Sequence, residues 1–162
     1  GWLPRWNEVA ASCNEQQAGL LYASNFSIGV NIFFSLNQKL AKLMAGHPEY
    51  QVSVEEIHHT AKKDAPSGTA ITLAEDIIRL SPGKTGWINA REAPDHLLPI
   101  HSIREDPAPG THRISYRSPV DDIDIIHTAH NRKGFATGAV LAAEFMQQKK
   151  GIYSMQDVLQ LH

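Results

Sequence analysis

The sequence predicts an α+β fold in which a four-stranded mixed sheet carries helices on one face. Apolar and polar residues alternate along four segments, residues 51–59, 100–106, 112–118 and 122–130, as they do in half-buried strands. Apolar residues recur at helical spacing in residues 26–44 and 69–80. Ile125 and Ile126 are adjacent, so the last strand is apolar on both faces. Such a sheet needs a second layer, and because the chain has few helices we expect another subunit to supply it.

The first elements are a helix and a short strand. Residues 2–17 place Trp6, Val9 and Cys13 on one helical face, and Gly19 interrupts this pattern. Residues 20–23 form a short apolar run that is typical of a buried strand. No strand precedes them, so we interpret the pair as an αβ unit without a partner strand.

A long helix is expected next, from about residue 26 to Met44. Asn25 or Ser27 is in place to cap it. Its predicted buried stripe consists of apolar residues at helical spacing, namely Phe33, Leu36, Leu40 and Leu43.

Prolines and glycines divide the remainder of the chain. Residues 81–99 show little periodicity, and we expect an extended loop there, a feature that often serves function or assembly. Turns at residues 107–110 and 119–121 join the last three predicted strands into a meander. A helix over residues 135–148 is expected to end before Gly151, and Ser154 caps a last short helix.

Composition excludes several classes of protein. The formal charge of −2 argues against electrostatic binding to nucleic acid or to an anionic membrane. No apolar run approaches the length of a membrane span. Cys13 is the single cysteine, so no internal disulfide can form, and we expect a cytoplasmic protein.

The stretch from Glu55 to Ala70, EEIHHTAKKDAPSGTA, carries the candidate chemistry. It starts as the end of a strand and finishes as a helix N-terminus capped by Ser67 or Thr69. Two histidines and two lysines lie between. A helix N-terminus offers N–H donors to an anion, lysine adds charge, and histidine can donate a proton near neutral pH. Ordinary helix capping and surface histidines would explain the same residues, so spacing alone leaves both interpretations open.

The same stretch resembles the signature of the dihydrodipicolinate reductase family of the lysine and diaminopimelate pathway. The resemblance extends over residues 1–162 and is strongest at 55–70, 23–31 and 127–139. It implies hydride transfer from NADH or NADPH to a cyclic imine dicarboxylate. It also implies a homotetramer whose C-terminal sheets meet in a central barrel.

The resemblance assigns roles within the motif. His58 would be the acid that protonates the reduced substrate, and Lys62 would pair with a substrate carboxylate and stabilise charge. Lys63 is less favoured, because the signature places its lysine four residues beyond the first histidine. The substrate-binding residues implied are His59, Gly68, Thr69 and Arg132.

The resemblance also implies a division into two parts. Residues 1–25 would be the last αβ piece of a Rossmann dinucleotide-binding domain, and residues 26–162 the substrate-binding and oligomerisation domain. The glycine-rich fingerprint of such a domain is absent from this sequence. We therefore expect little cofactor binding and no activity from this chain alone. The segment expected along the nicotinamide consists of Ala23, Ser24, Asn25 and Phe26.

Other functions compete with this hypothesis. One is a stand-alone oligomerisation or ligand-binding module without catalysis, and another is a different nicotinamide-dependent reductase on a similar domain. A metal-dependent hydrolase would need His127 and His130 to join His58 or His59. Residues three apart on a strand point to opposite faces, so we predict no metal site.

Overall fold

The computed structural model describes residues 2–161 and divides the chain into two compact units. Unit 1 consists of Gly1–Asn31 with Lys133–His162, and unit 2 of Ile32–Arg132. The outermost residues of the two predicted parts, 1 and 162, lie outside the described residues. The C-terminal segment thus folds with the N-terminal one. No helix among the described residues is long and apolar enough to cross a membrane.

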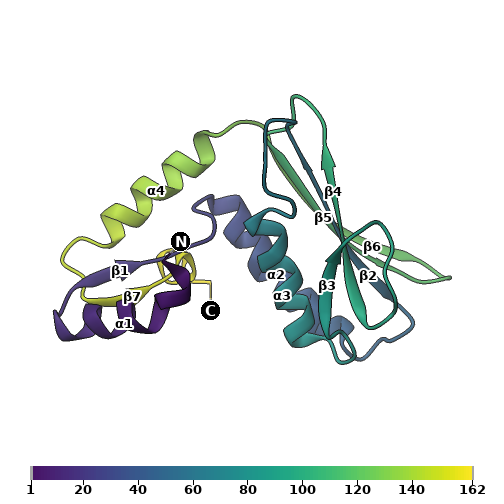
Figure 1. The fold of residues 1–162 in the computed structure, drawn as a ribbon, viewed down its shortest axis with the longest axis horizontal. Helices are drawn as coiled ribbons and strands as arrows, with labels where there is room; N and C mark the ends of the chain where they lie inside the picture. The colour runs from purple at the N-terminus through teal and green to yellow at the C-terminus, as the bar shows by residue number, and fades with distance from the viewer. Residues whose placement is uncertain (1, 162) are drawn as a thin grey trace. The chain divides into compact units, whose positions relative to one another are not determined.

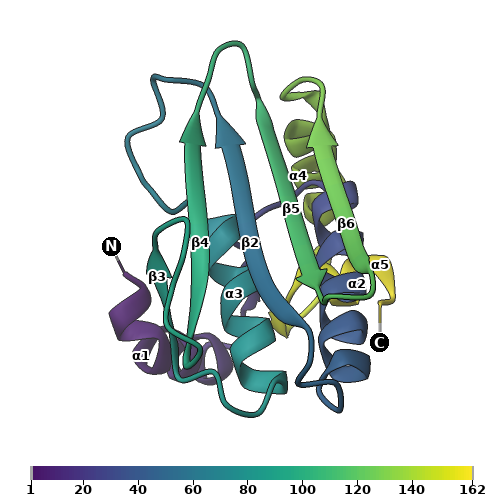
Figure 2. The ribbon, with the colours of Figure 1, turned by 90° about the vertical axis from the view of Figure 1, so that its right-hand side faces the viewer.

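Unit 2 is built on a five-stranded mixed sheet in the order β3-β4-β2-β5-β6 (Figure 2). The strands β3, β4 and β2 run parallel, whereas β2, β5 and β6 pair antiparallel. Helices α2 and α3 lie on one face of this sheet (Figure 1). The elements are α2 (Ile28–Met44), β2 (Gln51–His58), α3 (Gly68–Leu80), β3 (Gly86–Asn89), β4 (Leu97–Arg104), β5 (Gly110–Arg117) and β6 (Asp122–Ala129).

The α+β class and the mixed sheet are confirmed, but the number and order of strands were wrong. The fifth strand, β3, lies inside the predicted loop 81–99. It has four residues, too few for alternation to be visible, and it is fixed by pairing with β4. The predicted meander was wrong in part: β5 and β6 pair antiparallel across the predicted turn at 119–121, but β2 lies between β4 and β5. The helix α3 leads from β2 to β3 at the edge of the sheet, and β4 then lies between them, parallel to both. The other edge of β2 is left for β5.

The core of unit 2 lies between the sheet and its helices. Its largest fully buried apolar side chains come from α3 and from alternate strand positions, and they are Leu73, Ile77, Leu98, Ile100 and Ile114. Alternation places the apolar residues of each strand on the helix-covered face, and burying one such side chain contributes about 1.5–3 kcal/mol.

The predicted buried stripe of α2 was wrong in part. Phe33 is buried, but Leu36 is 50% exposed and Leu43 is 72% exposed. The buried positions are instead Val30, Phe33, Phe34, Asn37 and Ala41. Apolar residues surround much of this helix, so periodicity alone could not choose its inner face. The side chain of Asn37 donates a hydrogen bond to the Leu73 carbonyl of α3, and this contact lies on the buried side.

Unit 1 contains a two-stranded parallel sheet of β1 and β7. The strand predicted at 20–23 is present as β1 and has a partner, β7, which lies between the two predicted C-terminal helices where no strand was expected. The elements of the unit are a 3-10 helix (Leu3–Arg5), α1 (Trp6–Glu15), β1 (Gly19–Leu21), α4 (Lys133–Phe145), β7 (Gly151–Tyr153) and α5 (Met155–Leu159). Ser154 caps α5 as predicted, in a capping box with Asp157.

Gly138 allows α4 to approach the segment before α2 closely. A Cβ atom at this position would lie 1.7 Å from the backbone oxygen of Phe26. No side chain fits in that space, so glycine is required for this packing. The contact holds the predicted nicotinamide segment, residues 23–26, against α4.

Candidate functional site

The inner face of β2 changes from apolar to polar along the strand. Val52 and Val54 are buried in the core, and the next two residues on the same face are Glu56 and His58. Glu56 is fully buried and His58 is 7% exposed. Since buried ionisable groups need partners, this end of the strand is the place to look for a site.

The carboxylate of Glu56 has partners from four different segments. It accepts hydrogen bonds from the backbone N–H of Ser67, at 3.1 Å to Oε1 and 3.2 Å to Oε2. Nη2 of Arg104 lies 3.4 Å from Oε1. On the other side of the carboxylate, Oε2 lies 3.4 Å from Nδ1 of His58 and 3.8 Å from Nε2 of His112. A buried carboxylate thus lies between a guanidinium and two imidazoles.

The two imidazoles pack edge to face, with ring centroids 5.1 Å apart. Nδ1 of each ring has no hydrogen-bond partner among the described residues. A Cβ atom on Gly110 would lie 3.1 Å from Nε2 of His58, so the absence of a side chain there leaves space beside this nitrogen. No side chain of residue 110 therefore covers Nε2 of His58.

The surroundings shift the pKa of each group. Burial raises the pKa of the Glu56 carboxyl, but hydrogen bonds from Ser67 and the charge of His58 outweigh it and hold the pKa below its usual value. Burial lowers the pKa of His58, against the opposing effect of Glu56. Burial lowers the pKa of His112 to about 3, which keeps this ring neutral near neutral pH.

Glu56, His58 and His112 offer three donor atoms within 4.8 Å of one another. A carboxylate with two imidazoles is a set that binds zinc in other proteins. Here, however, Arg104 and the Ser67 N–H already neutralise the carboxylate. We therefore interpret the cluster as an ion-paired network. His127 is the cross-strand neighbour of His112, half-buried with its ring 6.0 Å from that of Phe33, and it is not one of the three donors.

The loop after β2 carries the predicted lysine. Nζ of Lys62 lies 2.9 Å from Oδ1 of Asp64, and this hydrogen bond lowers the pKa of Asp64. Arg104 holds this loop in place, because its guanidinium donates hydrogen bonds to the backbone carbonyls of Lys62 at 3.3 Å and of Asp64 at 2.5 Å. The same arginine thus contacts both Glu56 and the lysine loop.

The helix N-terminus predicted to bind a carboxylate is that of α3. Ser67 is its N-cap, and its Oγ accepts from the N–H of Ala70 at 3.2 Å; the alternative cap, Thr69, lies within the helix. Gly68 is exposed and Thr69 is 7% exposed. The substrate-binding roles of Gly68 and Thr69 stay predictions.

Arg132 and His59 lie together. Nη2 of Arg132 is 3.0 Å from Nε2 of His59, which joins the turn between β6 and α4 to the residue after β2. Unit 2 therefore brings the predicted residues into two groups, one around His58 and one of this pair.

The predicted cofactor segment, residues 23–26, belongs to unit 1. Asn25 Oδ1 accepts from the N–H of Ser27 at 2.9 Å, and Ser27 Oγ in turn accepts from the N–H of Val30 at 3.5 Å. Ser27 is thus the N-terminal cap of α2, one of the two residues predicted for it. The contact of residues 23–26 with a nicotinamide stays a prediction.

Sequence reasoning missed Glu56, Arg104 and His112 as members of the site. In the sheet, Glu56 is opposite His112 and His58 is opposite Arg104. The register between distant strands brings these residues together, and no local pattern reveals it. One signal was present, since alternation placed a carboxylate on the buried face two residues before His58.

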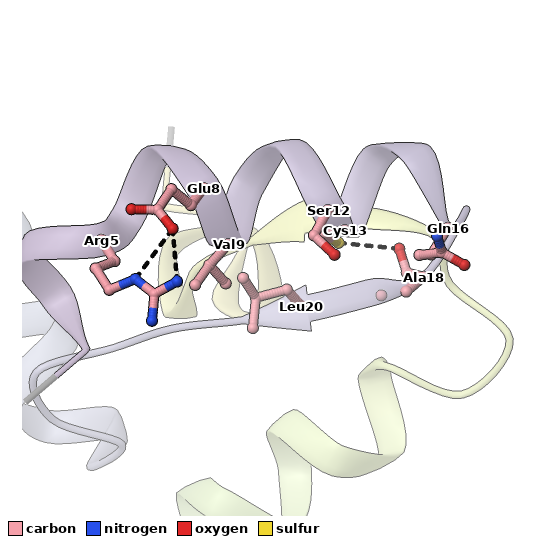
Figure 3. A pocket seen from close by; sticks show the side chains of 9 residues that line it. Arg5, Glu8, Val9, Ser12, Cys13, Gln16, Ala18 and Leu20 are labelled. Carbon is pink, nitrogen blue, oxygen red and sulfur yellow. Dashed lines mark hydrogen bonds and ion pairs between the residues drawn. The ribbon is translucent and has the colours of Figure 1, made fainter.

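Two cavities lie away from this site. One of about 530 Å³ lies in unit 1 between α1 and β1, where Arg5 pairs with Glu8 and Cys13 is hydrogen bonded to the Ala18 carbonyl (Figure 3). The other, of about 620 Å³, lies at the opposite end of β2 from His58, beside Gln51 and Val52. Neither is lined by a residue predicted for catalysis or substrate binding.

Comparisons with known proteins show the family of the chain. A family model described as dihydrodipicolinate reductase, C-terminus, matches residues 29–159. A 4-hydroxy-tetrahydrodipicolinate reductase of Christiangramia forsetii is 50% identical over 98% of the chain and 66% of its own length. One of Methanosarcina barkeri is 42% identical over 94% of the chain and 58% of its own length.

A solved structure shares the fold. It is a dipicolinate-bound dihydrodipicolinate reductase from Paenisporosarcina sp. TG-14, with a TM-score of 0.66 and 27% identity over 93% of this chain and 58% of that one. The chain therefore spans 58% to 66% of the length of the relatives named here.

Proposed function

Because the chain belongs to the dihydrodipicolinate reductase C-terminal family, we propose that it is the substrate-binding part of a 4-hydroxy-tetrahydrodipicolinate reductase. In this role it holds a cyclic imine dicarboxylate and supplies the proton that accompanies hydride transfer. The observation that carries the proposal is a buried imidazole, His58, whose Nε2 is not covered by a side chain at Gly110 and whose pKa is influenced by the charge of Lys62.

The two carboxylates of the substrate would each need their own hydrogen-bond donors from the chain. Lys62, whose side chain is 24% exposed, would leave Asp64 to pair with one carboxylate. The first turn of α3, at Gly68 and Thr69, would bind the other through backbone N–H groups, with the helix dipole in support. Arg132 would exchange its contact with His59 for a bidentate contact to a carboxylate.

The proton would come from Nε2 of His58. NADH or NADPH, when bound, supplies a hydride to an electrophilic ring carbon, and a proton must reach the neighbouring carbon. Protonated His58 would give that proton from Nε2 and become a neutral imidazole. Because burial lowers its pKa, the ring releases the proton readily.

Cofactor binding by this chain would be limited. The sequence contains no glycine-rich turn between a strand and a helix of the kind that holds a pyrophosphate. The residues that would lie along the nicotinamide are Ala23, Ser24, Asn25 and Phe26. Turnover would therefore require an added dinucleotide-binding domain.

The strand β1 of unit 1 would belong to that dinucleotide-binding domain, and β7 would extend its sheet. These two strands are parallel, and parallel strands occur almost only in larger sheets with helices on both faces. The division into residues 1–25 and 26–162 stays a prediction. The location in the cytoplasm and the absence of nucleic-acid or membrane partners stay predictions too.

Assembly as a homotetramer is part of the proposal. The helix-free face of the unit 2 sheet carries Ile57, Ile103 and Ile126, and within unit 2 no helix covers it. Ile126 is 50% exposed. A second copy of the sheet would bury these side chains. Light scattering should give a tetramer for the wild type and a smaller species for Ile126→Glu, and a wild-type monomer would contradict this part.

Calorimetric titration with pyridine-2,6-dicarboxylate, a planar substrate mimic, tests the central proposal. The wild-type chain should bind it. The affinity of Lys62→Ala should be at least tenfold lower, because a hydrogen bond to a charged group usually contributes that much to binding. The neighbouring Lys63 is exposed, and Lys63→Ala is the matched control that should bind normally. Equal weakening by both variants would count against a specific carboxylate contact.

The alternative is an oligomerising or ligand-binding module without catalysis. It is favoured by the sheet face of Ile57, Ile103 and Ile126, which no helix of unit 2 covers and which fits a role in assembly. Joining the chain to the dinucleotide-binding domain of a relative separates the two hypotheses. The reductase should then oxidise NADH or NADPH with its substrate and lose turnover in His58→Ala, whereas a module would bind dicarboxylate and show no turnover.

A further inference from the structure

We propose that Glu56 is a positioning residue, which holds Nδ1–H of His58 so that Nε2 is the nitrogen that carries the transferred proton. The role in proton transfer rests on the proposed function, but the orientation of His58 can be tested without turnover.

Among the described residues, Glu56 is the group whose position allows it to orient the His58 imidazole at Nδ1. Oε2 lies 3.4 Å from Nδ1, and this nitrogen has no hydrogen-bond partner among the described residues. At this distance the contact is an ion pair and not a hydrogen bond of good geometry. Such contacts are often long without a ligand and shorten when the site is occupied.

The carboxylate is itself fixed. The N–H of Ser67 and the guanidinium of Arg104 hold it from the side away from His58. Both come from rigid elements, the N-cap of α3 and the last residue of β4. A carboxylate held in this way orients the imidazole, just as carboxylates fix the tautomer of other functional histidines.

Charges around His58 make this carboxylate necessary. Lys62 and Arg104 disfavour a protonated ring, and Asp64 favours it from the exposed loop. His112 packs against the ring and contributes no negative charge. Glu56 is the nearest anion to Nδ1, so without it the protonated ring would be buried beside two cations.

Nitrogen-15 NMR of histidine in the wild-type chain is the first test. Neutral His58 should carry its proton on Nδ1, the tautomer that is the minor form in free histidine. Observation of the Nε2–H tautomer in the folded chain would overturn the proposal, and no variant is needed for this result.

Glu56→Gln is the second test, because it keeps an oxygen for the Ser67 N–H and removes the charge. The pKa of His58 should fall by about one unit or more, the usual effect of an opposite charge at this range. Glu55→Gln is a matched control, since Glu55 makes a similar pair with His101 at 3.5 Å on the other face of the sheet. It should leave the His58 titration unchanged.

Three outcomes separate this proposal from the proposed function. A His58 pKa unchanged in folded Glu56→Gln would overturn the positioning role. A shifted pKa without any dicarboxylate binding by the wild type would support positioning while counting against the reductase. In the chain joined to a dinucleotide-binding domain, Glu56→Gln should lower kcat much more than it changes KM.

Discussion

Nη2 of Arg132 lies 3.0 Å from Nε2 of His59, so a guanidinium in the turn between β6 and α4 donates to an imidazole just beyond β2. Arg132 is exposed and His59 is half-buried. Under the proposed function, Arg132 would exchange this partner for a ligand carboxylate. This contact is the basis of the first prediction.

Arg132→Lys should weaken binding of pyridine-2,6-dicarboxylate by about tenfold to a hundredfold. Lysine keeps the charge but loses the planar fork that binds a carboxylate with two parallel hydrogen bonds. Calorimetry measures the change. Arg117→Lys is the control, because Arg117 pairs with Asp122 at the far end of β5 and should not affect binding. An unchanged affinity in Arg132→Lys would remove this residue from the pocket.

Dicarboxylate binding should be accompanied by the uptake of a proton by His58. Burial lowers the pKa of His58 in the free chain, and a dianion beside the ring raises it again. Between the two pKa values the complex holds more protons than the free chain, so affinity rises as pH falls. The measured enthalpy should therefore vary with the ionisation enthalpy of the buffer. His58→Gln should abolish this variation, and a buffer-independent wild type would be the contrary result.

His112 should make the chain sensitive to acid. Its pKa is lowered to about 3 in the folded chain, so between pH 6.5 and 3 the unfolded chain binds the additional proton. Above this range both states are neutral, and within it this residue reduces the free energy of unfolding by about 1.4 kcal/mol for each pH unit of acidification.

Urea unfolding at pH 6.0 and 4.5 measures this effect. His112→Phe should flatten the dependence on pH, whereas His47→Phe, at an exposed position beside Glu49, should leave it unchanged. The same slope in the wild type and in His112→Phe would show that His112 is not the group responsible.

Gly138→Ala should destabilise unit 1 by about 1–3 kcal/mol, as overpacking does elsewhere. The added Cβ would lie 1.7 Å from the backbone oxygen of Phe26, and backbone must move to make room. Gly134→Ala on the same helix is the matched control. Its Cβ would lie 3.6 Å from Ser27 Oγ, an ordinary contact, so alanine should be tolerated or slightly stabilising. Thermal unfolding of the two variants compares them directly.

Local chemistry explains which parts of the fold could be predicted. Ser67 and Ser154 were identified as caps because capping depends on a few neighbouring residues. The strands β2, β4, β5 and β6 were found because their alternation extends over eight residues each. The strand β7 was missed, because its three residues are held by pairing with β1 from the other end of the chain.

The site divides in the same way. His58, His59 and Lys62 lie in one motif, so a single stretch of sequence identified them. Arg104 and His112 join through the register of β4 and β5 with β2, which depends on packing of the whole sheet. The side of α2 that faces the sheet was also decided by packing, since both of its candidate stripes are apolar.

One feature of β2 links correct folding to chemistry. Its inner face carries Val52 and Val54 into the core and then Glu56 and His58 into the site. A slip of one residue against its neighbours would turn all four side chains to the opposite face, because the side-chain period of a strand is two. Misaligned molecules would then lose the acid and bury Glu55 and Ile57 in its place. Ligand binding by this chain would therefore also report whether β2 has paired with its neighbours in the correct register.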